Sequence, residues 1–223
     1  MKTRYLPLAV LVATLAIPGQ AAAKSGDVQF KLLATYVAPD GKIKDVKLDL
    51  IGLPAGTQTK ADDNVVPTVA VEYFVTDNLS VETIAGVTQH DVVGRGALAG
   101  AGLVSNANIV PATLTLKYHF GKDGGVQPYV GAGPSYFIFI DEKPGATAVA
   151  LGATRQKMGD SLGMALQAGI DVPVNAKGLS VTFDAKRYYM RSTARWFAGT
   201  TEVLRTRHKL DPWVVSAGIA FRF

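Results

Sequence analysis

The residues of this chain that could carry out chemistry are three histidines and a set of charged side chains. The histidines are His90, His119 and His208, and the chain has no cysteine. The lack of cysteine excludes a thiolate metal site, a cysteine nucleophile and a disulfide. The histidines do not have the spacing of metal ligands, and no serine and acid combine with His119 in the order of a catalytic triad. We therefore expect no enzymatic activity, no metal and no cofactor.

The charged residues indicate a different chemistry, which is ion pairing. Seven titratable side chains stand at alternate positions of segments that alternate between apolar and polar residues: Lys31, Glu72, Glu82, Lys117, His119, Asp171 and Arg222. Because both signs of charge are present, these side chains can neutralise one another if the fold brings them into one narrow space. The elements that position them decide whether this happens.

The type of element is clearest in the last stretch of the chain, residues 211–223. Its odd positions are apolar: Trp213, Val215, Ala217, Ile219, Phe221 and Phe223. Its even positions are mostly small or polar, and a period of two predicts a β-strand with two different faces. Aromatic residues at both ends of the apolar face are typical of a strand that crosses a bilayer. Because the chain stops at Phe223, we expect this strand to close a barrel and to contact the barrel-assembly machinery.

Other segments alternate in the same way. They span residues 28–37, 65–75, 79–90, 110–120, 127–140, 161–172 and 179–191. Short turns alternate strictly with long loops at 38–64, 91–109, 141–160 and 192–210. This pattern predicts an all-β fold, an eight-stranded antiparallel up-and-down transmembrane β-barrel with short periplasmic turns. Thr83 and Ile84 break the alternation, and Arg187 falls on the apolar face unless a bulge rotates it inward.

The polar face of these segments favours a membrane barrel over a soluble one. On 127–140, 161–172 and the last strand, this face consists largely of Gly, Ala, Ser and Thr, which fit a narrow lumen. A solvent-exposed face, as in a lipocalin-like barrel, would more often carry Lys and Glu. The apolar face is almost free of charge, as contact with lipid requires.

The beginning of the chain predicts export. Lys2 and Arg4 precede an apolar run over 5–17, and the alanines at 21–23 offer a cleavage site. This is the pattern of a signal peptide at 1–23 for the Sec pathway, whereas the alternative, a membrane anchor, needs a longer run. We expect residues 24–223 to form one domain in an outer membrane.

Charge and glycine patterns give no sign of a nucleotide or nucleic-acid partner. The chain has 23 Lys and Arg against 18 Asp and Glu, a formal charge of +5, and no basic patch is interleaved with aromatic residues. Gly131 and Gly133 lie within a strand that no helix follows, so we expect lumen spacers or bulges there.

The inward residues of the predicted barrel differ with depth. The charges fall in the periplasmic half, where they should pair and form a plug. The inward residues of the outer half are apolar or aromatic: Leu33, Val37, Val66, Phe137, Phe139, Tyr188 and Val214. Two interpretations stay open. The first is the packed lumen of a non-conducting anchor. The second is a blind pocket for apolar solutes, because an apolar solute cannot cross the charged plug. Solutes in such a pocket would leave sideways between strands, and Pro111, which lacks an N–H donor, would favour a gap. For His119, the alternative to a plug residue is a base for lipid hydrolysis.

Several motifs together resemble the OmpW family. They are PYVGAG at 128–133, LTLKYHF at 114–120, DAK at 184–186, GLP at 52–54 and LDPW at 210–213. The resemblance covers the mature chain, although the second and third loops depart from the family in being rich in Ala and Gly. It implies an eight-stranded outer-membrane barrel of Gram-negative bacteria. The family includes the AlkL and OprG groups and is associated with passive uptake of small hydrophobic molecules by lateral diffusion. Leu53 matches a loop leucine that lines the hydrophobic entrance in that family.

Two functions remain open. The first is a channel for small hydrophobic solutes with its entrance at Leu53, Trp196 and Phe197 and with release into membrane lipid. The second is a structural or receptor barrel whose loops bind phage, colicin or host surfaces without transport.

Overall fold

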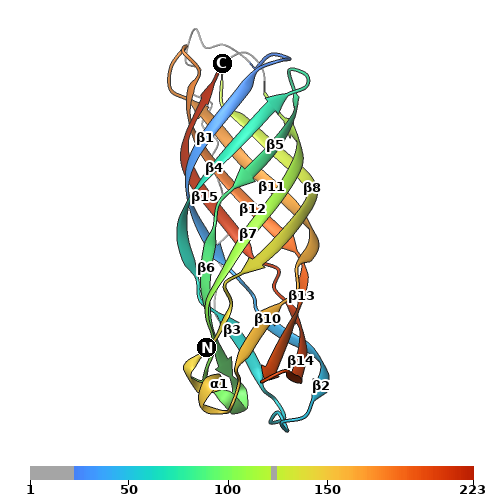
Figure 1. The fold of residues 1–223 in the computed structure, drawn as a ribbon. Coiled ribbons are helices and arrows are strands. Elements are labelled where there is room, and N and C mark those ends of the chain that lie inside the picture. The colour runs from blue at the N-terminus through green and yellow to red at the C-terminus, as the bar shows by residue number, and fades with distance from the viewer. Residues whose placement is uncertain (1–22, 122–124) are drawn as a thin grey trace, which may run out of the picture.

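Eight strands form a closed antiparallel barrel in the computed structural model, which describes residues 23–121 and 125–223 (Figure 1). They are β1 Val28–Ala38, β4 Asn64–Phe74, β5 Leu79–Ala85, β7 Gly102–His119, β8 Gln127–Ile140, β11 Ser161–Pro173, β12 Leu179–Tyr189 and β15 Trp213–Arg222. Each strand pairs with the next in this order, and β15 pairs back onto β1. The predicted eight-stranded barrel is thereby confirmed. The predicted signal peptide lies outside the described residues except for Ala23, and so does half of the predicted turn at 121–126, namely residues 122–124.

Successive residues of the barrel strands face lipid and lumen in turn, as the period of two predicts. On β1, Phe30 and Leu32 are exposed, whereas Lys31 between them is buried. On β15, Ile219 and Phe221 are exposed, whereas Ala220 is buried. A slip of one residue would move every charge of a strand into hydrocarbon, so the two faces also fix the register of the strands.

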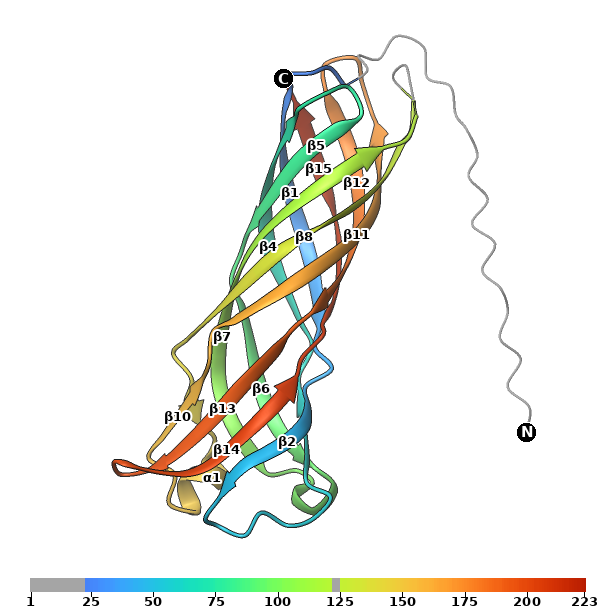
Figure 2. The ribbon, with the colours of Figure 1, turned by 90° about the vertical axis from the view of Figure 1, so that its right-hand side faces the viewer.

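The prediction of long loops is wrong in part, because these segments contain strands and one α-helix. A second sheet of four strands lies beyond the barrel end opposite the short turns (Figure 2). It has the order β10 Arg155–Met158, β13 Arg191–Ala198, β14 Thr201–Lys209 and β2 Lys42–Asp49. The outer part also contains β3 Gln58–Ala61, β6 Thr88–Arg95, the 3-10 helix Gly96–Leu98, β9 Lys143–Pro144 and α1 Ala146–Ala150. On β2 and β14 charged and apolar residues are mixed on both faces, so the lipid-type alternation that revealed the barrel strands is missing there. In the part of the chain that the structure describes, no helix is long and apolar enough to cross a membrane.

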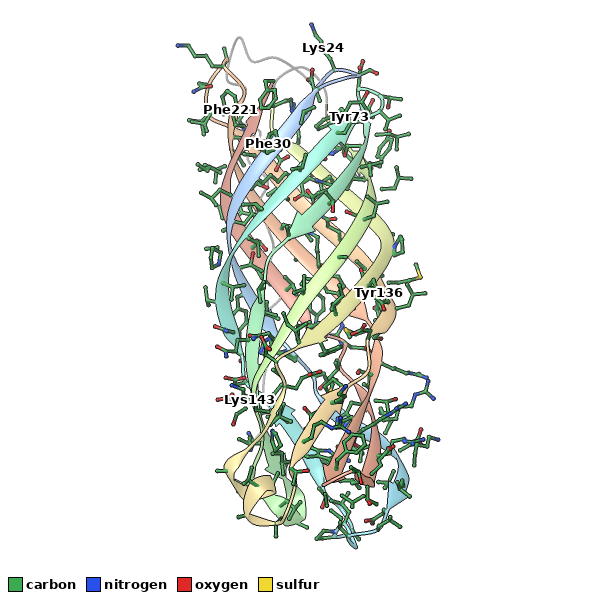
Figure 3. The ribbon with its side chains drawn as sticks, in the orientation of Figure 1. Lys24, Phe30, Tyr73, Tyr136, Lys143 and Phe221 are labelled. Atoms are coloured by element: carbon green, nitrogen blue, oxygen red, sulfur yellow. The ribbon has the colours of Figure 1, made fainter. Side chains whose placement is uncertain are left out.

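Aromatic side chains on the outer surface indicate two membrane boundaries. Phe30, Tyr73 and Phe221 lie near the short-turn end of the barrel, and Tyr136 lies nearer the outer sheet (Figure 3). All four rings are partly exposed. Aromatic rings concentrate at the headgroup levels of a bilayer, so the apolar wall between these two levels is the lipid-facing band.

The predicted strand 79–90 is in fact two strands, β5 and β6, separated at Gly86 and Val87. Thr83 and Ile84, where the sequence predicts the irregularity, pair regularly with β7. The register of β5 with β7, continued past the last pair, places Gly86 opposite Pro111. Because proline has no N–H to donate, the ladder is interrupted at this position.

Arg187 stays on the outward face, and the bulge considered for it does not occur. Strand β12, which is described throughout, pairs with β11 and β15 across this residue without a register shift. The Arg187 guanidinium lies 5.1 Å from the centroid of the Trp213 ring. This cation–π contact holds the charge against an aromatic ring, and the long stem lets it reach the headgroup level.

A charge placed on the lipid-facing band should destabilise the barrel. Leu114 is exposed on β7 between Tyr118 and Ala112, which pairs with Tyr136 at the outer boundary. We expect Leu114→Arg to lower the free energy of unfolding by about 2–4 kcal/mol in urea titrations of the protein in lipid vesicles. Leu50→Arg, in the exposed loop after β2, is the matched control and should change it little. Equal losses in both variants would contradict lipid contact at Leu114.

Candidate functional site

Two glutamates in the lumen face each other from neighbouring strands. Glu72 of β4 is the register partner of Glu82 of β5, and both are buried. Like charges directly opposite one another destabilise a sheet, so this pair requires cations. Nζ of Lys31 lies 2.8 Å from Oε2 of Glu72 and 2.9 Å from Oε2 of Glu82. Nζ of Lys117 lies 2.7 and 2.9 Å from the same two oxygens, so each ammonium group bridges both carboxylates.

The ion network extends across the lumen to β11 and β12. Nζ of Lys186 lies 3.2 Å from Oε1 of Glu82 and 2.7 Å from Oδ1 of Asp184. The Gln167 amide donates to Glu82 at 2.9 Å and to Asp184 at 2.6 Å, and the Tyr129 hydroxyl donates to Asp184 at 2.9 Å. Every carboxylate here therefore accepts bonds from more than one strand.

Near the short-turn end, Gln29 connects the two remaining ions. Its amide donates to Oδ2 of Asp171 at 3.0 Å, and its carbonyl oxygen accepts a bond from Nε of Arg222 at 2.9 Å. The Arg222 guanidinium also donates to Gln127 at 2.9 Å and lies 4.6 Å from the centroid of the Phe74 ring.

We call this ion network the plug. Its charged members are Lys31, Glu72, Glu82, Lys117, Asp171, Asp184, Lys186 and Arg222. Four cations match four carboxylates, and removal from water makes ions costly unless each is paired and hydrogen-bonded. The short-turn half of the lumen is therefore filled by a neutral but polar network.

All seven residues that the sequence predicts for the plug lie in it, and the structure adds two charged residues. Asp184 and Lys186 were missed, although the sequence carried their signal. Both stand on the polar face of the predicted strand 179–191, and both are buried. The tilt of a strand brings a residue far from its end beside the ends of other strands, so position along the strand does not by itself give the depth in the lumen.

His119 contacts a serine and a carboxylate, a grouping that the sequence analysis also missed. Its Nε2 lies 2.9 Å from Oγ of Ser80 and 2.7 Å from Oε1 of Glu72. In a catalytic triad the serine and the acid bind opposite nitrogens of the ring. Here both contact Nε2, and Nδ1 has no hydrogen-bond partner among the described residues. The geometry is that of a plug contact. Within the same described ranges, no cluster of His, Asp and Glu is arranged to hold a metal ion.

An apolar cavity of about 100 Å³, which we call the inner cavity, lies in the outer half of the barrel. Its wall includes the buried residues Val37, Phe137, Phe139, Tyr188, Met190 and Val214. The rings of Phe137 and Tyr188 meet edge to face with their centroids 5.2 Å apart. Leu33, which the sequence predicts in this pocket, packs instead with Ala70 and Ile84 in a separate buried cluster.

A second apolar cavity of about 170 Å³, the outer cavity, lies beneath the four-stranded sheet. Leu53 and Trp196 line it, whereas Phe197 does not and instead packs its ring 4.1 Å from the Arg155 guanidinium. The Leu53 loop is held by Asp49, which accepts a bond from the Leu53 N–H at 2.8 Å. The two cavities share wall residues: Ala61, Val92, Val104, Met158 and Leu210. They therefore adjoin, the outer cavity beneath the four-stranded sheet and the inner cavity within the barrel.

One titratable side chain lines the outer cavity. His208 of β14 is buried, with Nε2 2.8 Å from the Thr206 hydroxyl and Nδ1 3.4 Å from the Thr59 hydroxyl. Burial lowers the pKa of His208 to about 4, because an apolar surrounding disfavours the imidazolium. The ring is thus neutral at neutral pH, so His208 adds no charge to the wall of the outer cavity.

A seam in the barrel wall adjoins the inner cavity. The register pairs with β7 stop before Gly86 and Val87 and resume after them. The continued registers place Gly86 opposite Pro111 and Val87 opposite Pro67 of β4, and neither proline has an N–H to donate. Gly86, Val87 and Pro111 line the inner cavity, and Val87 is also 52% exposed on the outside. Cavity wall and lipid-facing surface therefore meet at the seam.

Comparison with known proteins gives a consistent result. The chain matches the model of the OmpW family over residues 24–223. The uncharacterized outer-membrane protein y4mB of Sinorhizobium fredii is 33% identical over 77% of this chain and 71% of its own length. Outer membrane protein W of Vibrio cholerae is 28% identical over 100% of both chains. The crystal structure of the outer membrane protein OprG from Pseudomonas aeruginosa superposes with a TM-score of 0.79 at 28% identity, covering 91% of this chain and 98% of OprG. The predicted family resemblance and outer-membrane location are confirmed.

Removal of a plug carboxylate should cost much more stability than removal of an exposed one. Glu82 pairs with three lysines, so Glu82→Ala leaves buried cations short of a partner and should lower the free energy of unfolding by about 3–5 kcal/mol. Glu202→Ala is the matched control, because the ion pair of Glu202 is with Arg205 in the outer sheet, and it should change stability little. Urea titration in vesicles measures both, and a small effect at Glu82 would contradict the plug.

Acid should weaken the outer sheet through His208. The pKa of this histidine is lower in the folded protein, about 4, than the ~6.5 of an unfolded histidine. The unfolded form therefore binds the proton more tightly, so the stabilisation is complete above about pH 6.5 and is lost as the pH falls toward 4, by up to ~3 kcal/mol. Amide hydrogen exchange of β13 and β14, corrected for intrinsic rates, should show this loss of protection. The His208→Gln variant should lose most of the pH dependence, and an unchanged dependence would refute the assignment to His208.

Proposed function

The chain belongs to the OmpW family of outer-membrane proteins, and on that premise we propose that it is a channel for the passive uptake of small hydrophobic molecules. The observation that carries the proposal is a pair of adjoining apolar cavities, the inner of which lies between a charged plug and a break in the barrel wall. The proposal has three parts, which are an entrance, a floor and a sideways exit.

The entrance is the outer cavity. Leu53 and Trp196 line it, and the neutral state of His208 leaves it without a charge on its wall. An apolar solute loses no hydrogen bonds on entering such a space and gains burial of its surface at roughly 25 cal/mol per Å². A polar solute would leave its water without compensation, which costs several kcal/mol for an unpaired group. The outer cavity therefore favours apolar solutes, and the wall residues shared by the two cavities carry them on to the inner cavity.

The floor is the plug. Below the inner cavity, a solute meets a buried network in which Lys31 and Lys117 each bridge two carboxylates. Passage straight through would separate ions that are already removed from water, and breaking one such buried pair costs about 3–5 kcal/mol. A solute that has reached Phe137 and Tyr188 therefore leaves more easily by another route.

The exit is the seam. The Gly86 position has no side chain, and Pro111 opposite it cannot donate a ladder hydrogen bond. Local separation from β7 at this position breaks fewer hydrogen bonds than at any regularly paired position. The outer wall of the barrel lies directly beside it, because Val87 is exposed on that surface. A hydrophobic solute released at this point enters the membrane without contacting water.

A reversible cross-link across the seam tests the lateral exit. The chain has no cysteine, so Val87→Cys with Val110→Cys places the only thiols on the lipid side of the seam. Bridging them with a short thiol-reactive bis-thiosulfonate should reduce uptake of an alkane or monoterpene into proteoliposomes at least fivefold, and a reductant should restore it. The fold should persist, because the bridge joins residues that already adjoin.

The matched control joins two strands that are regularly paired. Val71→Cys with Thr83→Cys places thiols at register partners of β4 and β5, and bridging them should leave uptake unchanged. Equal inhibition by both bridges would contradict the seam as the exit. An unbridged protein that gives no uptake above empty liposomes would overturn the channel itself and favour a structural or receptor barrel.

A further inference from the structure

The outer face of the four-stranded sheet carries rows of like charges. Arg195 of β13 lies between Lys157 of β10 and Arg205 of β14 in the register, and Arg191 lies opposite Lys209. Like charges directly opposite one another are destabilising in a sheet. Such an arrangement is stable when anions lie over it, and the chain itself supplies some of them.

The chain neutralises only part of this basic face. Arg205 pairs with Glu202, and Lys209 pairs with Asp211 at 2.9 Å. Across residues 23–121 and 125–223, no carboxylate lies within ion-pair distance of the side chains of Lys157, Arg191, Arg195 and Arg207. Arg207 lies opposite Asp45 in the register, but the ion pair of Asp45 is with Lys47. The face therefore keeps an excess of positive charge, which attracts an external anion.

Two of these arginines, Arg191 and Arg207, line a hollow of about 600 Å³. Arg191, Arg207 and Lys209 stand on its outer side, and Leu162 and Tyr189 stand on its membrane side. Leu162 is 75% exposed and Tyr189 is 49% exposed on the lipid-facing wall of the barrel. The hollow thus joins a basic surface to a hydrocarbon surface.

The two carboxylates in the hollow are already engaged. Asp211 accepts bonds from the Met190 N–H at 2.9 Å and from Lys209. Asp160 accepts bonds from the Phe139 N–H at 3.2 Å and from the Tyr136 hydroxyl at 3.3 Å. Both acids thereby hold backbone at the barrel rim, and the two arginines remain free to bind an anion.

We propose that this hollow binds the phosphorylated head group of an acylated glycolipid in the outer leaflet. Guanidinium groups bind phosphate oxygens in a bidentate manner, and basic residues at a membrane surface are attracted to anionic lipids. A free phosphate would use only the basic side of the hollow, whereas a lipid also covers Leu162 and Tyr189 with its acyl chains. The site lies on β11 to β14, whereas the seam lies between β4 and β7, so the lipid site is independent of the channel.

Titration of the detergent-solubilised barrel with diphosphoryl lipid A, followed by native mass spectrometry without divalent cations, tests this inference. The Arg191→Gln/Arg207→Gln variant should bind lipid A about tenfold or more weakly than the parent protein. The control variant Lys44→Gln/Lys47→Gln removes the same charge from β2 of the same sheet, away from the hollow, and should bind within twofold of the parent. Retained heat-modifiability in gel electrophoresis verifies that each variant is folded.

The remaining arms separate the lipid from other anions. Lipid A without its phosphates should bind at least tenfold more weakly to the parent protein, and inorganic pyrophosphate should not displace lipid A at equal concentration. Equal weakening in both double variants would show that net charge alone is responsible, and this would overturn the site. Displacement by pyrophosphate would also overturn it, in favour of a site for free phosphate.

Discussion

The barrel depends on the ion network that fills the short-turn half of its lumen. Each of the eight barrel strands places a side chain in this network: Lys31, Glu72, Glu82, Lys117, Tyr129, Asp171, Lys186 and Arg222. A buried pair of this kind is weak evidence for stability by itself, since desolvation offsets much of the attraction. Its stronger effect is on register, because a strand that slips by one residue loses its partners and exposes its own charge to lipid. The network thus selects one arrangement of the strands.

The division of the lumen follows from where these charges end. On β12, Lys186 belongs to the ion network and Tyr188, the next inward residue, lines the inner cavity. A single step of the strand therefore separates a polar floor from an apolar chamber. The polar floor and the apolar chamber are two consequences of one sequence pattern, and the break in the ladder at Gly86 lies at the level of the chamber.

Much of the barrel could be predicted because lipid imposes a strict pattern on one face of each strand. The outer part could not, because its strands face water and a small cavity, and segments such as Thr201–Lys209 show no regular change between apolar and polar residues. The break at Gly86 was placed wrongly, since it depends on the Pro111 opposite, which is distant in sequence. The clusters around His119 and Asp184 depend in the same way on contacts between strands. Leu33 shows that inward direction alone does not place a residue in a cavity, because depth and neighbours decide the rest.

The pairing of β1 with β15 has a consequence for how the molecule is made. These strands are separated by most of the sequence, so closure is the contact of longest range in the fold and brings a correspondingly slow search. Until Trp213–Arg222 has paired on both sides, two open edges expose backbone N–H and C=O groups that hydrocarbon cannot satisfy. An intermediate that lacks only this strand is therefore poorly soluble both in water and in lipid. Biogenesis requires either a surface that temporarily covers the open edges or a nearly simultaneous insertion of the whole cylinder.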